Sequence, residues 1–243
     1  MGLEVTMLVI GFVGQKGGVG KTVLAQVTVN AALARHSENR VLLIEADKQG
    51  SSMAFYTRVI QNYPELANRF SCVWVNDESE LTKAIENADE QNYDYVVIDT
   101  AGSHAELTKF VFAEADKVLI PFRPVLKEYE SQLATVEVAH NVKNTLATNG
   151  YEGPSFRLVL NNWSHKQRLT VEQKQALATV QEDPNVADFY IPERNAFDTL
   201  DQGIILHLEL EKPEVIANPI VRRNKTEDLQ LALQTLEHIE AMK

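Results

Sequence analysis

Cysteine, cationic charge and long hydrophobic runs are all scarce in this chain of 243 residues. Its one cysteine, Cys72, excludes an intramolecular disulfide and any cysteine-rich metal site made by one chain. Because Cys72 lies in the apolar run FSCVWV, we expect a small core residue rather than a reactive thiol. No apolar run approaches the roughly 18 residues that would span a membrane, and residues 1–13 lack the cationic region and cleavage site of a signal peptide. These absences predict a soluble, cytoplasmic protein.

Positive charge is outnumbered, since 23 Lys and Arg residues stand against 34 Asp and Glu, a net charge of −11. Such an acidic chain argues against a protein coated in nucleic-acid-binding surface. One local basic patch is still open, particularly if a dimer presents it twice. Hydrophobic residues make up 44% of the chain, which is enough to bury a substantial core and to exclude global disorder.

Short apolar, β-branched runs alternate along the chain with longer segments of helical periodicity. Seven runs read as strands, several of them apolar almost throughout, which favours strands buried on both faces of a mainly parallel sheet: 7–13, 40–46, 70–75, 93–99, 117–122, 156–161 and 186–191. Helices are expected at 22–36, 77–88, 126–147, 170–182 and 227–243, with Asp77 or Ser79 capping the second and Thr170 the fourth, and an irregular segment at 209–225. The alternation predicts one α/β domain over residues 1–243, a doubly wound, mainly parallel sheet flanked by helices.

The segment GQKGGVGKTV, residues 14–23, has the composition of a phosphate-binding loop. Such a loop needs small residues whose backbone N–H groups face phosphate oxygens, a helix behind it, a lysine for the phosphates and a Ser or Thr for Mg²⁺. Gln15 stands where such a loop usually has glycine, and Lys16 is an additional lysine that its placement alone would also allow as a solvated loop residue. The residues expected to bind ATP are Gly17, Gly18, Val19, Gly20, Lys21, Thr22 and Val23, and Thr22 is also a metal candidate.

The run KGGVGKT resembles the deviant Walker A motif of the ParA/MinD family of ATPases, which have a P-loop NTPase fold. In that family the early lysine reaches across a dimer interface to the phosphates of the partner's ATP. The resemblance therefore implies catalytic roles for Lys16 and Lys21, ATP and Mg²⁺ as cofactors, and a homodimer that forms with ATP. It covers residues 7–205 and looks most like small plasmid-borne ParA-like proteins, including the branch that assists conjugative DNA transfer.

The segment VLLIEADKQGSS, residues 41–52, resembles the family's switch I, in which an aspartate positions the attacking water. That residue is Asp47, which the resemblance makes a catalytic and a metal-site residue. Phosphoryl transfer depends mainly on a positioned water and on charge neutralisation, so a carboxylate at this strand end suits the reaction. Glu45 stands where the family usually has Asp, and Lys48 where it usually has Pro. The alternative role for Asp47 is to cap the helix that follows.

The segment YDYVVIDTAG resembles the family's Walker B motif and switch II. An acid at the carboxyl end of a buried strand faces the ligand crevice in open α/β sheets. Asp99 is therefore expected to hold Mg²⁺ through a water, and Gly102 to let the switch move.

Two weaker resemblances concern the base of the nucleotide. FRLVLNNW matches a strand that ends in an asparagine near the adenine, here Asn161. YIPERNAF resembles a loop that packs against the base, with Pro192 and Glu193 as candidates for ATP binding. A plain turn is the alternative explanation of either segment.

Family members that carry metal clusters use cysteine pairs, so that role is excluded here. Members that cycle on membranes end in a basic amphipathic helix. The expected last helix is instead acidic and should be repelled by anionic lipid, so no membrane partner is expected; its charges are Glu227, Asp228, Glu237 and Glu240 against Lys243.

The compact basic cluster VRRNK, with Arg222, Arg223 and Lys225, lies just before that helix. Presented twice by a dimer, it would give a sequence-independent phosphate footprint for double-stranded DNA. Lys166 and Arg168 are additional candidates. The alternative is an ordinary solvated loop. Aromatic residues are not interleaved with these charges, so single-strand binding by base stacking is not indicated.

Together these features predict a Mg²⁺-dependent ATPase switch for plasmid partition, DNA transfer or cargo positioning. ATP drives dimerisation through Lys16, the dimer binds DNA nonspecifically and so associates with the nucleoid, and slow hydrolysis through Asp47 resets it. A ParB-like or cargo-adaptor protein is the expected activator. The alternative function, favoured by the acidic charge, is an ATP-dependent adaptor that positions a protein cargo without binding DNA. A ligase-type enzyme such as dethiobiotin synthetase has a similar loop but lacks support from Lys16.

Overall fold

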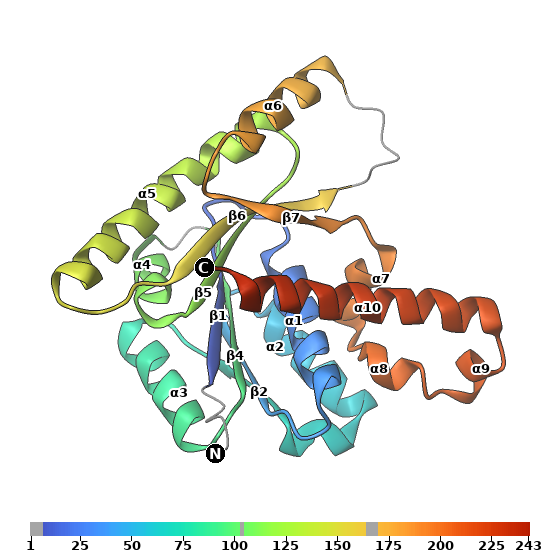
Figure 1. The fold of residues 1–243 in the computed structure, drawn as a ribbon. Helices are drawn as coiled ribbons and strands as arrows, with labels where there is room; N and C mark the ends of the chain where they lie inside the picture. The colour runs from blue at the N-terminus through green and yellow to red at the C-terminus, as the bar shows by residue number, and fades with distance from the viewer. Residues whose placement is uncertain (1–6, 103–104, 164–169) are drawn as a thin grey trace, which may run out of the picture.

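The computed structural model describes residues 7–102, 105–163 and 170–243 of the chain. Seven parallel strands form one sheet in the order β3-β2-β4-β1-β5-β6-β7. They are β1 (Leu8–Phe12), β2 (Val41–Ala46), β3 (Phe70–Trp74), β4 (Tyr95–Thr100), β5 (Lys117–Phe122), β6 (Ser155–Trp163) and β7 (Val186–Pro192). Every strand lies within two residues of its expected bounds, and the doubly wound α/β sheet flanked by helices is confirmed (Figure 1).

Helices cover both faces of the sheet, and each face has its own hydrophobic core (Figure 1). One face carries α1 (Lys21–Arg35), α2 (Ser51–Asn62) and α10 (Pro219–Ala241), and the other α3 (Glu78–Glu90), α4 (Ala105–Glu114), α5 (Leu126–Thr148) and α6 (Val171–Gln181). Ile10 and Phe12 enter the first core and Val9 and Val13 the second, because successive side chains of a strand point to opposite faces. Burial on both faces explains why the strands read as unbroken apolar runs.

Two of the expected helix starts are confirmed by their caps. Asp77 accepts a hydrogen bond from the backbone N–H of Glu80 at 3.0 Å at the start of α3. Thr170 and Gln173 form a capping box at the start of α6. The sequence did not indicate α2, α4 or the short segments η1 (Pro64–Asn68), α7 (Asn195–Asp198), η2 (Leu200–Gln202), α8 (Leu206–Glu209) and α9 (Pro213–Ile216).

The last helix, α10, begins at Pro219, eight residues before the expected position 227. Asn218 caps it, since its side chain accepts hydrogen bonds from the N–H groups of Ile220 and Val221, and a proline in the first turn has no N–H to leave unpaired. The basic cluster therefore lies in the first turns of α10, and the expectation of a loop there was wrong. Neither α10 nor any other helix in the described ranges is long and apolar enough to cross a membrane.

The carboxyl ends of three central strands lie side by side. Glu45 near the end of β2 is in register with Asp99 of β4, and Asp99 is in register with Phe12 of β1. The segments that follow these strands therefore meet at one edge of the sheet, which is where open α/β sheets bind their ligands.

Candidate functional site

A cleft of about 540 Å³ opens at this carboxyl edge. The ends of six strands, or the segments that follow them, line it, so residues far apart in the sequence meet there. Of the residues expected to bind ATP or to act in catalysis, the lining includes Gly17, Gly18, Gly20, Lys21, Thr22, Val23, Asp47, Asn161 and Pro192. It also includes residues that the sequence did not indicate: Gln15, Gln49, Ser51, Thr100, Ala101, Arg123, Asn162, Ile191, Arg194, Phe197 and Asp198.

The loop between β1 and α1 takes backbone conformations that glycine permits. Gly18 and Gly20 have φ angles of 78° and 99°, in the left-handed region. Gly20 is the N-cap of α1, where the first backbone N–H groups have no partner within the helix and can bind an anion. A Cβ atom at Gly17 or Gly18 would meet no atom within 4 Å. The loop can therefore approach a phosphate group closely.

Asn161, near the end of β6, supports this loop from the side. Its Nδ2 donates a hydrogen bond to the carbonyl oxygen of Val19 at 2.8 Å, and the side chain is buried. A Cβ atom at Gly20 would lie 2.0 Å from the same nitrogen, so Gly20 also makes room for Asn161. Asn161 thus joins the cleft to the phosphate loop, and its position near an adenine stays a prediction.

The ammonium group of Lys21 is turned into the loop. Its Nζ donates a hydrogen bond to the carbonyl oxygen of Lys16 at 3.0 Å, and Lys21 is only 6% exposed. Burial lowers the pKa of Lys21, and the carboxylates of Asp99 and Asp47 oppose that shift. A cation removed from water in this way interacts strongly with an anion that enters the loop.

Lys16 lies in different surroundings. It is half-buried but outside the lining of the cleft, and its Nζ makes a long hydrogen bond, 3.4 Å, to the carbonyl oxygen of Lys127 in the first turn of α5. Gly102, after β4, packs against the same stretch of loop, since a Cβ atom there would lie 2.7 Å from the backbone N of Gly17. The two lysines of the loop therefore make separate contacts, Lys21 inside it and Lys16 outside the cleft.

The segment after β2 is organised around Glu45, which is fully buried. Glu45 Oε1 accepts a hydrogen bond from the N–H of Asp47 at 3.0 Å, and Oε2 accepts from the N–H groups of Ser52 at 2.6 Å and Met53 at 3.3 Å. Burial raises the pKa of Glu45 although these backbone amides oppose the rise. Because Glu45 takes the first amides of α2, the alternative role of Asp47 as that helix's cap is wrong. Asp47 lines the cleft instead.

Asp99 is fully buried beneath the loop. Its Oδ2 accepts a hydrogen bond from the hydroxyl of Ser52 at 2.8 Å, and its Oδ1 has no hydrogen-bond partner in the part of the chain that the structure describes. Burial and then the neighbouring Glu45 raise the pKa of Asp99 to about 7, against the opposing effects of the Ser52 and Thr22 hydroxyls and the Lys21 ammonium. An unpaired, buried carboxylate oxygen of this kind calls for a cationic partner.

These residues fit Mg²⁺. A hard cation prefers oxygen ligands, and Mg²⁺ usually keeps several waters and takes one or two carboxylates together with substrate phosphates. Asp99 Oδ1, the Thr22 hydroxyl and the cleft-lining Asp47 supply oxygens of that kind. The described residues contain no group of three or more His, Cys, Asp and Glu side chains that could hold a metal ion alone, so the phosphates of a nucleotide would complete the site.

At the far end of the cleft, Pro192 belongs to the lining and Glu193 does not. Glu193 is exposed, and the next residue, Arg194, faces the cleft in its place. Arg194 also forms ion pairs with two carboxylates of α10, Asp228 at 2.9 Å and Glu227 at 3.2 Å. The sequence did not single out Arg194, because only the adjacent Pro192 and Glu193 carry the resemblance.

The basic cluster projects at the start of α10. Arg222 and Arg223 are exposed, and Arg223 forms an ion pair with Glu227 one turn later at 3.1 Å. Arg222 makes no ion pair with any other described residue. Lys166 and Arg168 lie outside the described residues. The arginines are thus the accessible part of the cluster.

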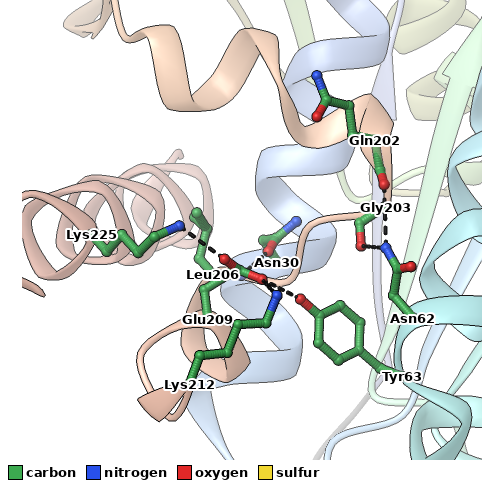
Figure 2. Close-up of polar contacts among 9 residues, drawn as sticks. All are labelled: Asn30, Asn62, Tyr63, Gln202, Gly203, Leu206, Glu209, Lys212 and Lys225. Atoms are coloured by element: carbon green, nitrogen blue, oxygen red, sulfur yellow. Dashed lines mark hydrogen bonds and ion pairs between the residues drawn. The ribbon is translucent and has the colours of Figure 1, made fainter. Parts of the chain in front are cut away.

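Lys225, the third member of the cluster, points inward. Figure 2 shows its ammonium directed at the buried carboxylate of Glu209, together with Lys212 and the hydroxyl of Tyr63. The Lys225 Nζ lies 2.9 Å from Glu209 Oε2, and the Tyr63 hydroxyl donates to Oε1 at 2.6 Å. Burial alone would raise the pKa of Glu209, but these hydrogen bonds and that of Lys212 lower it to about 2. The charge of Lys225 is therefore largely compensated within the fold.

A family model described as VirC1 protein matches residues 7–242. Two curated relatives match over most of their length. The virC1 protein of Rhizobium radiobacter is 29% identical over 211 residues, and that of Rhizobium rhizogenes is 28% identical over 205 residues; each match covers 84% of both chains.

Solved structures share the fold at lower identity. Apo McdA from Cyanothece superposes with a TM-score of 0.63 at 19% identity, covering 94% of this chain and 100% of its own. A putative plasmid partition protein of Borrelia burgdorferi bound to AMPPNP has a TM-score of 0.58 at 18% identity, covering 94% and 99%. The cell division protein MinD of Aquifex aeolicus has a TM-score of 0.57 at 19% identity, covering 97% and 98%. The resemblance to the ParA/MinD family is confirmed.

Proposed function

The chain belongs to the VirC1 protein family, and from that premise we propose that it is a Mg²⁺-dependent ATPase that works as a dimerisation switch. The observation that carries the proposal is the meeting of the glycine loop, Lys21 and Asp47 in one cleft, together with the buried Asp99, which interacts with Lys21 and whose Oδ1 no described residue pairs. A phosphate-bearing ligand and a hard cation complete the hydrogen bonds and charges that this arrangement leaves open.

Each group has a distinct task in the hydrolysis. The loop N–H groups and Lys21 bind and neutralise the phosphates, while Thr22 and Asp99 would hold Mg²⁺, which supplies further charge neutralisation when bound. Asp47 orients the attacking water. The water adds to the terminal phosphorus as the bond to the bridging oxygen breaks, which yields ADP, inorganic phosphate and a proton released to solvent.

Lys16 is proposed to serve the nucleotide of a second protomer. It stands outside the cleft of its own chain, and its hydrogen bond to the carbonyl oxygen of Lys127 is long, at 3.4 Å. Exchanging such a bond for a phosphate contact costs little. ATP binding and homodimer formation would then be the same event, with Lys16 and Lys21 acting on different nucleotides.

The dimer is proposed to bind double-stranded DNA without sequence preference through Arg222, Arg223 and Lys225, and so to associate with the nucleoid. The support is the exposure of both arginines at the end of a helix that extends from the body of the protein (Figure 1). A ParB-like or cargo-adaptor protein would accelerate the slow turnover. The solved neighbours include a plasmid partition protein and a MinC:MinD complex.

Two assays with the full chain test this function. With ATP and Mg²⁺, the wild type should release phosphate faster than the Lys21→Ala variant, which no longer binds the phosphates through an ammonium group. Gel retardation of an arbitrary DNA duplex should require ATP, fail with ADP or without nucleotide, and weaken steeply as salt rises. Absence of phosphate release under all conditions would refute the ATPase assignment.

A second function is an ATP-dependent adaptor that positions a protein cargo without touching DNA. Two observations favour it: the net charge of −11, and the ion pairs that Lys225 and Arg223 already make with acidic side chains. ATP hydrolysis and ATP-driven dimerisation without retardation of DNA at any salt concentration would support this adaptor over the DNA-bound switch.

A further inference from the structure

We propose that Glu45 is a positioning residue of the hydrolysis site, which holds the segment after β2 and the first turn of α2 so that Asp47 and Asp99 face the nucleotide. The inference deepens the proposed ATPase function and rests on it. It concerns a buried side chain that does not line the cleft, so Glu45 would act only through its neighbours.

The carboxylate of Glu45 accepts hydrogen bonds from three backbone N–H groups of the segment that follows it. Both of its oxygens are used: Oε1 by the N–H of Asp47 at 3.0 Å, and Oε2 by the N–H groups of Ser52 at 2.6 Å and Met53 at 3.3 Å. A buried carboxylate requires such bonds, and hydrogen bonds to a charged group are the stronger kind. Glu45 therefore fixes the two ends of the segment from Asp47 to Met53 by hydrogen bonds to one carboxylate.

Ser52 connects Glu45 to Asp99. It gives its backbone N–H to Glu45 and its hydroxyl to Asp99 Oδ2, at 2.8 Å. Glu45 and Asp99 are also partners across the β2–β4 pairing, so Ser52 stands between two buried carboxylates and donates to both. Because this hydroxyl occupies Oδ2, Oδ1 is the oxygen that no described residue pairs, and it is the one that can meet a cation.

The length of the Glu45 side chain sets these distances. An aspartate at position 45 would be shorter by one carbon–carbon bond, about 1.5 Å. Hydrogen bonds of 2.6 to 3.3 Å cannot lengthen by that amount and persist. A glutamine keeps the length of the side chain but presents an NH₂ group to at least one backbone N–H. Both changes should displace Asp47 and release Ser52 from its orientation toward Asp99.

A simple role as a helix cap is the alternative, and it makes a different prediction. Loss of a cap lowers the stability of α2 without altering how Asp47 and Asp99 act on the nucleotide. Misplacement of a catalytic group by about 1 Å can lower the rate of the chemical step by about a hundredfold, whereas binding through the phosphate loop would continue. The two roles can therefore be told apart kinetically: a positioning residue affects kcat much more than KM, whereas a helix cap affects mainly stability.

The test compares four full-length proteins: the wild type, Glu45→Gln, Glu45→Asp and Ser52→Ala. We measure kcat and KM for ATP hydrolysis, the Mg²⁺ concentration that half-saturates ATP binding, and hydrogen exchange of the 47, 52 and 53 amides without nucleotide. Glu45→Gln should lower kcat by about tenfold or more while KM changes by about threefold or less, and should raise the Mg²⁺ requirement. Amide exchange should accelerate in both Glu45 variants, and Ser52→Ala should raise the Mg²⁺ requirement while leaving the amide of Asp47 protected.

Glu209→Gln is the matched control, because Glu209 is a second buried carboxylate with three donors but lies away from the cleft. It should lower the melting temperature and leave kcat and KM unchanged. If Glu45→Gln behaves like this control, Glu45 is only a cap and the positioning role is wrong. A wild type that releases no phosphate would refute the proposed ATPase instead, and the Mg²⁺ requirement and amide exchange would then decide the role of Glu45 by themselves.

Discussion

Lys225 of α10 lies 2.9 Å from the buried carboxylate of Glu209 (Figure 2), while the side chains of Arg222 and Arg223, two and three residues earlier, are exposed to solvent. The three basic residues of the cluster are close together in the sequence, but this ion pair gives Lys225 surroundings different from those of the two arginines. Arg222 and Arg223 offer charge to a partner, whereas Lys225 joins α10 to α8. The three residues should therefore respond differently to substitution.

The variant Arg222→Ala/Arg223→Ala should abolish ATP-dependent DNA binding and keep its melting temperature. Arg222→Ala alone should still bind DNA, and because it removes one phosphate contact it should reduce the slope of log affinity against log salt by about 0.9. Lys225→Ala should instead lower the melting temperature, because it removes a donor from a buried carboxylate. Lys83→Ala, which removes an exposed lysine of α3 on the opposite face of the sheet, is the control. If Lys83→Ala and the arginine substitutions reduce DNA affinity equally, a DNA-binding site on α10 is ruled out.

The titration of Glu209 should make the free energy of unfolding depend on pH in the acidic range. Its folded pKa, about 2, is lower than the ordinary value of 4.5. The unfolded chain therefore binds more protons in this range, so the stabilisation is complete above about pH 4.5 and is lost as the pH falls toward about 2. Urea unfolding of Glu209→Gln should show a loss of about 3 kcal/mol at pH 7 and a smaller difference from the wild type at pH 3. A difference that stays constant between these pH values would contradict the assignment.

Strands were predictable from the sequence because burial on both faces forces nearly continuous apolar runs, as in residues 41–46 and 95–100. The phosphate loop was predictable because its glycines are demanded by local backbone geometry, as at Gly20 with its φ of 99°. In both cases the cause lies within a few residues of the effect.

Other features depend on contacts that a local pattern does not contain. The start of α2 was missed because its amides are bound by Glu45, which belongs to the preceding strand. The start of α10 carries an Asn-Pro signal, but the polar residues after it conceal the helical pattern. The inward direction of Lys225 depends on Glu209, 16 residues earlier. The sequence alone does not show which residues from different elements will pair in this way.

Gly102→Ala should disturb the phosphate loop from behind. An added Cβ atom would lie 2.7 Å from the backbone N of Gly17 and 2.8 Å from the carbonyl carbon of Lys16, and backbone atoms cannot move aside as a side-chain end can. We expect a loss of about 1–3 kcal/mol in the free energy of unfolding together with weaker ATP binding. Gly17→Ala is the control for stability, because its Cβ atom meets nothing within 4 Å. If Gly102→Ala has the stability of the wild type, the backbone of the phosphate loop can shift to accommodate the added Cβ atom, and this prediction is wrong.

Asp47→Ala should separate ATP binding from hydrolysis. The side chain lines the cleft, and the buried Glu45, rather than Asp47, binds the first amides of α2, so its removal should leave the fold intact. Loss of the water-orienting carboxylate should lower kcat by about a hundredfold or more and prolong the life of the ATP-bound dimer. Phosphate release and sedimentation velocity measure the two effects. Undiminished phosphate release would assign the water to another group.

Lys16→Ala should abolish ATP-dependent dimerisation and keep ATP binding, because Lys16 is outside the cleft and Lys21 inside it. The Asp47→Ala background gives the clearest readout, since the dimer accumulates there: sedimentation should show dimers with ATP for Asp47→Ala and monomers for Lys16→Ala/Asp47→Ala. Lys127→Ala is the matched control, because Lys16 donates its hydrogen bond to the backbone oxygen of Lys127, which the substitution retains. Full dimerisation of the double variant would disprove a role of Lys16 across the interface, and weakened ATP binding by its monomer would instead place Lys16 on the nucleotide of its own chain.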